Sequence, residues 1–115
     1  MTPGDEPAPF LYVVRCNFTD PAHAEGWNSF YADEHGPALL GMPGFRSLTR
    51  YEAVGLDQSI QHMALWELES PTALESEEYR TYGGGNWPAE WKPYVTDWTR
   101  AVFKKTLHLR TGSAD

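Results

Sequence analysis

Runs of residues typical of β-strands alternate with helical segments along this chain, and their order limits the folds open to it. The order is strand, helix, strand, strand, helix, strand, with strands expected at residues 10–18, 45–54, 59–69 and 97–109 and helices at 19–40 and 70–82. Two such strand–helix–strand units with right-handed crossovers form a four-stranded antiparallel sheet with both helices on one face. We therefore predict an α+β fold with a single domain at residues 10–109, a flexible arm at 1–9 and a polar tail at 110–115.

Both expected helices begin with a capping residue followed by proline. These pairs are Asp20-Pro21 and Ser70-Pro71. Asp and Ser side chains accept hydrogen bonds from first-turn amides, and proline suits the first helical position. Pro37 lies inside the first helix and has no amide hydrogen for the preceding turn. We therefore expect a kink or break near residues 34–36.

The first and third expected strands carry apolar residues on both of their faces. Helices can cover only one face of the predicted sheet. An apolar sheet face left without cover favours association with a second copy of the chain. The sequence therefore predicts a homodimer in which the two sheets face each other.

Charge and cysteine content exclude several classes of protein. The formal net charge of −7 disfavours binding to nucleic acid or to an anionic membrane. Cys16 is the only cysteine, so neither an internal disulfide nor a cysteine-based metal site is expected. No apolar run reaches the roughly 18 residues of a membrane span, and the first residues lack the pattern of a signal peptide. We therefore expect a cytoplasmic protein.

His35 is the strongest candidate for a catalytic residue. Trp27, Tyr31 and His35 recur at intervals of four residues and share one face of the expected helix. Imidazole titrates near neutral pH, so His35 can take up and return a proton in one catalytic cycle. The alternative is a structural role at a helix end, where an imidazolium ion favours the carbonyl dipoles.

Three further side chains are candidates for the same site. His62 belongs with Ile60 and Trp66 on one side of its strand, and this side faces either the helices, beside His35, or a partner sheet. Tyr31 and Tyr51 are each either a hydrogen-bond donor to a bound carbonyl or phenolate, or a half-buried core residue.

Aromatic and basic residues suggest how a ligand would be bound. Four tryptophans form either a wall for a flat aromatic ligand or part of an aromatic core: Trp27, Trp66, Trp87 and Trp91. Arg46 and Arg50 are expected on one strand face, where Arg50 either holds an acidic substrate or pairs with carboxylates at the dimer rim. Gly83–Gly85 would serve as the hinge of a flap or as an ordinary loop.

Sequence signals for cofactors are lacking. The glycine run has neither the lysine nor the strand–helix context of a phosphate-binding loop, and no flavin or nicotinamide fingerprint occurs. The separated histidines make a weak metal signal. We therefore expect no metal and no cofactor, with catalysis by side chains alone.

One segment resembles a known superfamily. The stretch His35-Gly-Pro-Ala-Leu-Leu-Gly-Met-Pro-Gly-Phe45, followed by Arg50-Tyr51, resembles the dimeric α+β-barrel superfamily, and within it the EthD-like and methylmuconolactone-isomerase-like proteins. The resemblance covers residues 10–109. It implies a ferredoxin-like βαββαβ fold that dimerises into an α+β barrel. It also implies that His35 transfers protons in a pocket between the helices and the sheet.

The resemblance suggests a cofactor-free enzyme of secondary metabolism. It would act on a hydrophobic aromatic or polyketide-like intermediate as an isomerase, cyclase or lyase, by isomerisation, cyclisation, dehydration or decarboxylation. The alternatives are a cofactor-independent monooxygenase of anthrone-like phenols and a non-catalytic dimeric ligand-binding or accessory protein. Haem-degrading members of the superfamily resemble the chain at Asn17 and Trp66, but residues 72–82 lack the histidine that those members need.

Overall fold

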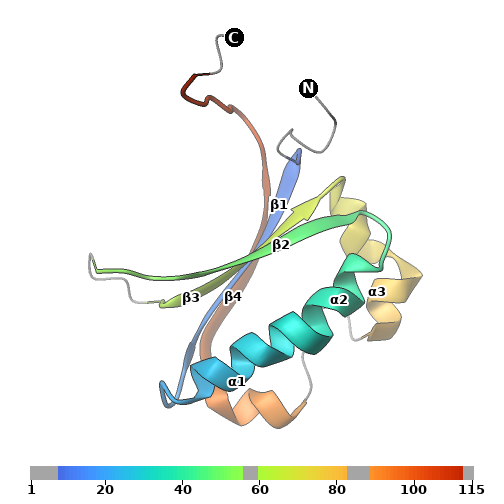
Figure 1. The fold of residues 1–115 in the computed structure, drawn as a ribbon. Helices are drawn as coiled ribbons and strands as arrows, with labels where there is room; N and C mark the ends of the chain where they lie inside the picture. The colour runs from blue at the N-terminus through green and yellow to red at the C-terminus, as the bar shows by residue number, and fades with distance from the viewer. Residues whose placement is uncertain (1–7, 56–59, 83–88, 113–115) are drawn as a thin grey trace.

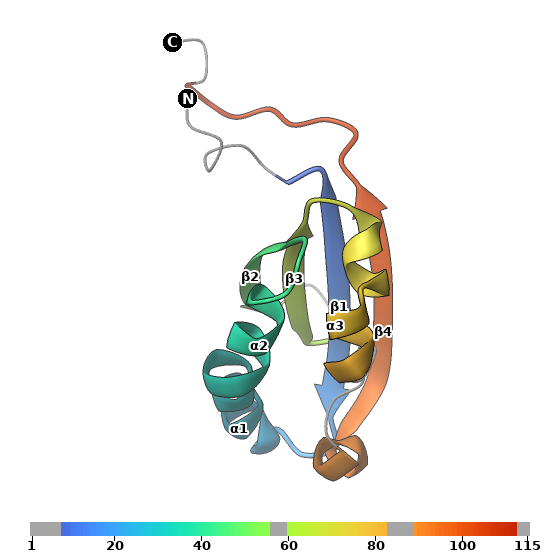
Figure 2. The ribbon, with the colours of Figure 1, turned by 90° about the vertical axis from the view of Figure 1, so that its right-hand side faces the viewer.

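A computed structural model describes residues 8–55, 60–82 and 89–112. The described residues form four strands and three short α-helices: β1 (Phe10–Phe18), α1 (His23–Phe30), α2 (Gly36–Leu40), β2 (Phe45–Glu52), β3 (His62–Leu68), α3 (Glu77–Tyr82) and β4 (Val95–Lys104). The strands form one sheet in the order β2-β3-β1-β4, and all neighbouring pairs are antiparallel. The helices gather on one side of this sheet (Figures 1 and 2). The predicted α+β fold with a four-stranded antiparallel sheet is therefore confirmed.

The first helical segment is continuous but irregular. A π-helical turn, Tyr31–His35, joins α1 to α2, and the Gly36 amide donates to the carbonyl oxygen of Tyr31. A π turn widens the helix locally, which accommodates a proline that would otherwise clash with the preceding turn. The segment therefore passes through Pro37 without ending, and the irregularity expected near residues 34–36 takes this form.

Both predicted helix boundaries need correction. The first helix begins at His23 and not at residue 19, because the His23 amide donates to the Asp20 carbonyl in a preceding turn. The second predicted helix is two pieces, a 3₁₀ segment at Pro71–Glu75 and then α3. Ser76 separates them with an extended backbone, and its hydroxyl accepts from the Tyr79 amide as the cap of α3.

Three predicted strands are longer than the strands in the structure. The second, expected at 45–54, is β2 and ends at Glu52. The third, expected at 59–69, is β3 and covers only His62–Leu68. The fourth, expected at 97–109, is β4, which begins at Val95 and ends at Lys104. Lys104 pairs with Phe10, where β1 begins. Residues 105–109 are not a strand because β1 offers no further residues for pairing.

A bulge in β2 changes which side chains face the helices. The register of β2 against β3 shifts between Phe45 and Ser47. Phe45 is buried in the core, and Leu48 and Arg50 also face the helices. Strict alternation would put Phe45 on the face opposite Leu48 and Arg50, and the bulge changes this by inserting one residue.

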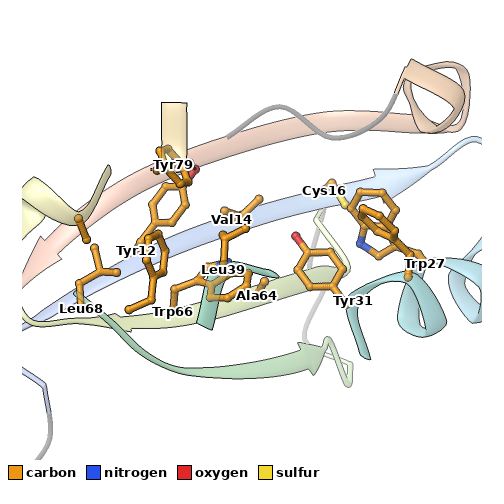
Figure 3. Packing of buried hydrophobic residues seen from close by; sticks show 13 residues of the cluster. Tyr12, Val14, Cys16, Trp27, Tyr31, Leu39, Ala64, Trp66, Leu68 and Tyr79 are labelled. Carbon is orange, nitrogen blue, oxygen red and sulfur yellow. Dashed lines mark hydrogen bonds between the residues drawn. The ribbon is translucent and has the colours of Figure 1, made fainter. Parts of the chain in front are cut away.

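The core lies between the inner sheet face and the helices. Figure 3 shows buried side chains from β1, from β3 and from the helical segments meeting in one layer. The fully buried large side chains are Trp27, Leu39, Trp66, Leu68 and Tyr79. Cys16 is also buried here, as a free thiol whose pKa burial raises to about 11. It is therefore a small apolar core residue, as expected.

Candidate functional site

His35 lies inside a cage of aromatic rings. Its side chain is only 6% exposed. The Phe30 ring stacks on the imidazole at 5.2 Å between centroids, and Tyr31 meets it edge-on at 5.0 Å. Trp66 closes the sheet side at 5.7 Å. Burial lowers the pKa of His35 to about 4, so the imidazole is neutral at neutral pH.

The π turn holds this histidine close to the sheet. Gly36 follows His35, and a Cβ atom at position 36 would overlap the carbonyl oxygen of Tyr31. The same Cβ would lie 3.1 Å from a methyl group of Leu48 on β2. Glycine at this position therefore allows the wide turn and the close approach of helix and strand together.

Tyr82 anchors the imidazole from the other helical segment. Its phenol oxygen lies 3.1 Å from Nδ1 of His35, and its ring is 5.5 Å away between centroids. Among the described residues, Nε2 of His35 has no hydrogen-bond partner. One ring nitrogen is thus held by Tyr82, and the other has no hydrogen-bond partner among the described residues.

A second group of predicted residues lines a cavity beside the cage. The cavity measures about 390 Å³ and lies between the helical segment carrying Tyr31 and the strands β2 and β3. Tyr31, Arg50 and His62 contribute to its wall. The Arg50 guanidinium carbon lies 4.4 Å from the centre of the Tyr31 ring. Tyr31 is therefore shared by the His35 cage and this cavity.

His62 is on the helix side of the sheet but away from His35. It alternates along β3 with the buried Ala64 and Trp66, and its ring meets Phe18 edge-on at 4.7 Å. Burial lowers its pKa, against an opposing effect of the Glu52 carboxylate. The structure therefore places His62 with Arg50 rather than as a direct partner of His35.

The remaining predicted residues have different positions. Trp27 and Trp66 are fully buried core residues, while Trp91 is half-buried and packs on Trp27 at 5.1 Å. Tyr51 is 53% exposed and lies at the cavity mouth. Trp87 and the Gly83–Gly85 hinge lie outside the described residues.

Arg46 and Arg50 differ in their surroundings. Arg46 forms an ion pair with Glu69, at 3.5 Å, near the surface. Arg50 is turned inward over Tyr31, and its Nε donates to the Met63 carbonyl at 3.4 Å. The bulge after Phe45 separates the two arginines, so the expectation that they share one face does not describe the site.

Sequence reasoning missed Tyr82 and Phe30. Both contact the His35 ring directly. Phe30 lies one residue before the predicted Tyr31, on a stretch where the π turn breaks the regular spacing. Tyr82 closes the second helical segment, and only the packing of two segments on one sheet face brings it to His35.

The residues do not fit a haem site of the kind that the resemblance suggested. Asn17 donates to Asp97 at 3.0 Å and accepts from the Gln61 amide at 2.7 Å, so its amide is committed to the protein. Trp66 is buried in the core. The segment from Pro71 to Tyr82 carries no histidine. Within the described ranges, no group of three or more His, Cys, Asp or Glu side chains is placed to hold a metal ion.

Solved structures share this arrangement. A DABB family protein with a ferredoxin-like fold from Mesorhizobium loti matches with a TM-score of 0.60 at 11% identity, over 84% of this chain and 96% of its own. An EthD family protein from Bacillus halodurans matches with a TM-score of 0.55 at 14% identity, over 84% of this chain and 99% of its own. The chain has a ferredoxin-like fold. The fold resemblance predicted from the sequence is therefore confirmed.

A third structure with this ferredoxin-like fold is an enzyme. The heme degrader MhuD from Mycobacterium tuberculosis, solved with two hemes in its active site, matches with a TM-score of 0.61 at 16% identity, over 89% of this chain and all of its own. No protein-family model matches the sequence, and no curated protein does. In the described part of the chain, no helix is long and apolar enough to cross a membrane. These comparisons establish the fold, and the site residues must carry any argument about activity.

Proposed function

We propose that the protein is a small enzyme that transfers protons on a hydrophobic aromatic or polyketide-like molecule, with His35 as the proton acceptor. The observation that carries this proposal is the state of His35: caged, neutral and anchored through Nδ1 by Tyr82, with Nε2 left unpaired among the described residues. At neutral pH the imidazole is in the form that accepts a proton, and its fixed orientation positions Nε2 as a general base.

In the proposed reaction, Nε2 of His35 removes a proton from a carbon next to a carbonyl group. The electron pair of that C–H bond moves toward the carbonyl oxygen, which becomes an enolate or phenolate. Return of the proton to another atom completes an isomerisation, and loss of a leaving group completes a dehydration. Tyr31 is a candidate donor to the new oxyanion, because burial raises its pKa and keeps the phenol protonated.

Hydrogen exchange tests this function without knowledge of the natural substrate. The protein would be mixed in D₂O with 2-tetralone and with anthrone, and loss of the acidic C–H signals would be followed by NMR. The expected result is catalysed exchange that falls by about 10²–10⁴-fold in His35→Phe, the usual contribution of a general base. His108→Phe serves as the control because His108 is exposed. Exchange that is equal in both variants would refute the role of His35.

The other two hypotheses give different results in the same assay. A cofactor-independent monooxygenase would consume oxygen with anthrone, which an oxygen electrode detects. A ligand-binding or accessory protein would bind these compounds without exchange, and His35→Phe would retain the affinity. The neutral imidazole of His35, held through Nδ1 by Tyr82, is the observation that favours the proton-transfer enzyme over a purely binding role.

We also propose that the chain forms a homodimer through its outer sheet face. That face carries a row of apolar side chains, of which Phe103 is exposed and four are half-buried: Leu11, Val13, Met63 and Leu65. Phe103 is 55% exposed, which is unusual for a large aromatic side chain. Light scattering after gel filtration should give twice the mass of one chain for the wild-type protein, and the mass of one chain for Leu65→Glu. A monomeric wild-type protein would refute the dimer.

A further inference from the structure

Arg50 is a half-buried cation whose contacts with the described residues leave one of its buried donors unpaired. Its Nη1 is buried and has no hydrogen-bond partner among the described residues. The Nε contact to Met63 is long, at 3.4 Å, and the Tyr31 ring offers only its face. Burial lowers the pKa of Arg50, but an arginine stays charged at neutral pH. Buried donors are normally paired, so this arginine needs another explanation.

Arg50 also lacks a partner carboxylate in the described part of the chain. No carboxylate there lies within 4.0 Å of its guanidinium, whereas Arg46 on the same strand pairs with Glu69. Glu52 lies in the same cavity wall, and its charge raises the pKa of Arg50, but it is exposed and forms no ion pair with Arg50. An anion in direct contact with Arg50 would therefore come from outside these residues.

The cavity beside Arg50 has the composition of a small-molecule site. Asn28 and His62 supply polar groups to its wall, and Ala32 and Leu48 supply apolar surface. Its volume of about 390 Å³ falls within the usual range for ligand pockets. An arginine at one wall, and apolar surface at another, suits a flat molecule with one acidic end.

We propose that this cavity binds the carboxylate group of a small aromatic ligand, with the Arg50 guanidinium as the partner of the carboxylate. His62 and Asn28 provide further hydrogen bonds at the cavity wall. This inference rests on the proposed function in naming the acidic end of the same ligand, because Tyr31 borders both Arg50 and His35. The carboxylate site itself requires no proton transfer.

The test compares a carboxylate with its neutral amide. The full chain would be titrated with 2-naphthoate and with 2-naphthamide by isothermal calorimetry. We expect naphthoate to bind at least about tenfold more tightly than the amide, as for a charge-assisted hydrogen bond. Arg50→Met should weaken naphthoate about tenfold and leave naphthamide unchanged. Arg46→Met is the matched control and should leave both affinities unchanged, because Arg46 pairs with Glu69.

Several results would overturn the proposal. These are equal affinity for the two compounds, no detectable naphthoate binding, or the same loss in Arg46→Met as in Arg50→Met. If Arg50→Met fails to fold, the Arg50 Nε–H signal of the wild-type protein gives the answer by NMR. The chemical shift of that signal should change on addition of naphthoate and remain the same on addition of naphthamide. No change with either compound would refute the site.

The exchange assay separates this inference from the proposed function. Naphthoate binding through Arg50 without any catalysed exchange would leave the carboxylate site standing and reject the enzyme. Catalysed exchange without a preference for naphthoate would support the enzyme and reject the carboxylate site. His35→Phe should keep naphthoate affinity within about threefold, because His35 is not in the wall of this cavity.

Discussion

The imidazole of His35 and the phenol of Tyr82 meet at 3.1 Å although 47 positions separate them in the sequence. His35 ends the π turn and Tyr82 ends α3, so this contact joins the two helical segments that cover the sheet. Among the described residues, this is the one hydrogen bond that the His35 side chain makes. The orientation of the proposed catalytic base therefore depends on the relative position of the two segments.

Removal of the Tyr82 hydroxyl should destabilise the protein. Tyr82→Phe leaves Nδ1 of a buried histidine without its partner, which typically costs about 1–2 kcal/mol. Tyr51→Phe is the matched control because Tyr51 is exposed, and it should change the free energy of unfolding by less than about 0.5 kcal/mol. Urea unfolding at pH 7 measures both variants. Equal stability of the two would mean that the bond to His35 contributes nothing.

The stability of the protein should fall as the pH drops from about 6.5 to about 4. The pKa of His35 is lowered in the folded protein from 6.5 to about 4, so in this window the unfolded chain binds a proton that the folded protein does not. Stability that is present above pH 6.5 is therefore lost on acidification, by up to about 3 kcal/mol in total. Urea unfolding at half-unit pH steps would measure the loss.

His35→Phe is the control for this pH dependence. Phenylalanine keeps an aromatic ring in the cage and has no proton to bind. The variant should lose most of the slope between pH 6.5 and pH 4. His62, whose pKa is also lowered by burial, contributes the remainder in the same direction below pH 6.5, and the Glu67 carboxylate with its lowered pKa contributes at lower pH. An unchanged slope would show that His35 titrates as an exposed histidine does, which would contradict its burial.

Gly36 should tolerate no side chain. Gly36→Ala places a Cβ atom against the Tyr31 carbonyl and near Leu48, so the π turn or strand β2 must move. We expect a loss of about 1–3 kcal/mol and a weaker proton exchange activity, because His35 moves with the turn. Gly41→Ala is the control, since its nearest contact, the Pro37 carbonyl at 3.6 Å, is an ordinary one. Circular dichroism on heating would compare the two, and equal midpoints would refute the close approach.

The sequence predicted the order of strands and helices along the chain, and the packing of both helical segments on one sheet face, because apolar periodicity records burial. It placed Trp27, Tyr31 and His35 on one face, and the structure buries all three. It did not predict the bulge after Phe45, because a single inserted residue leaves the composition of the strand unchanged. The position of Arg50 on the helix side of the sheet follows from that bulge, so the sequence could not predict it either.

The sequence also could not show which residues meet across the fold. His62 shares a strand side with Trp66, yet it contacts Phe18 and lines the Arg50 cavity. Tyr82 carries no motif, and only the packing of α3 brings it to His35. Residue type and spacing thus identify candidates, while their grouping into a cage and a cavity depends on tertiary contacts.

Asp97 should be sensitive to loss of its side chain because of its backbone. Its φ angle is 54°, in the left-handed region that Asp and Asn tolerate better than other residues with side chains. Its carboxylate accepts from Asn17 at 3.0 Å and from Thr96 at 3.3 Å. Asp97→Ala should lower the free energy of unfolding by about 1–2 kcal/mol, because alanine disfavours this φ and cannot accept either bond.

Asp97→Asn separates the backbone effect from the charge. Asparagine tolerates a positive φ and keeps one oxygen acceptor for Asn17, so we expect a loss of less than about 0.5 kcal/mol in urea unfolding. Asp97→Gly accepts the φ angle but loses both bonds, so its stability should lie between the other two. If Asp97→Asn were as unstable as Asp97→Ala, the charge of Asp97 would be the stabilising feature. Neither the φ angle nor the hydrogen bond to Asn17 would then explain why this residue stands in the bulge of β4, opposite Cys16.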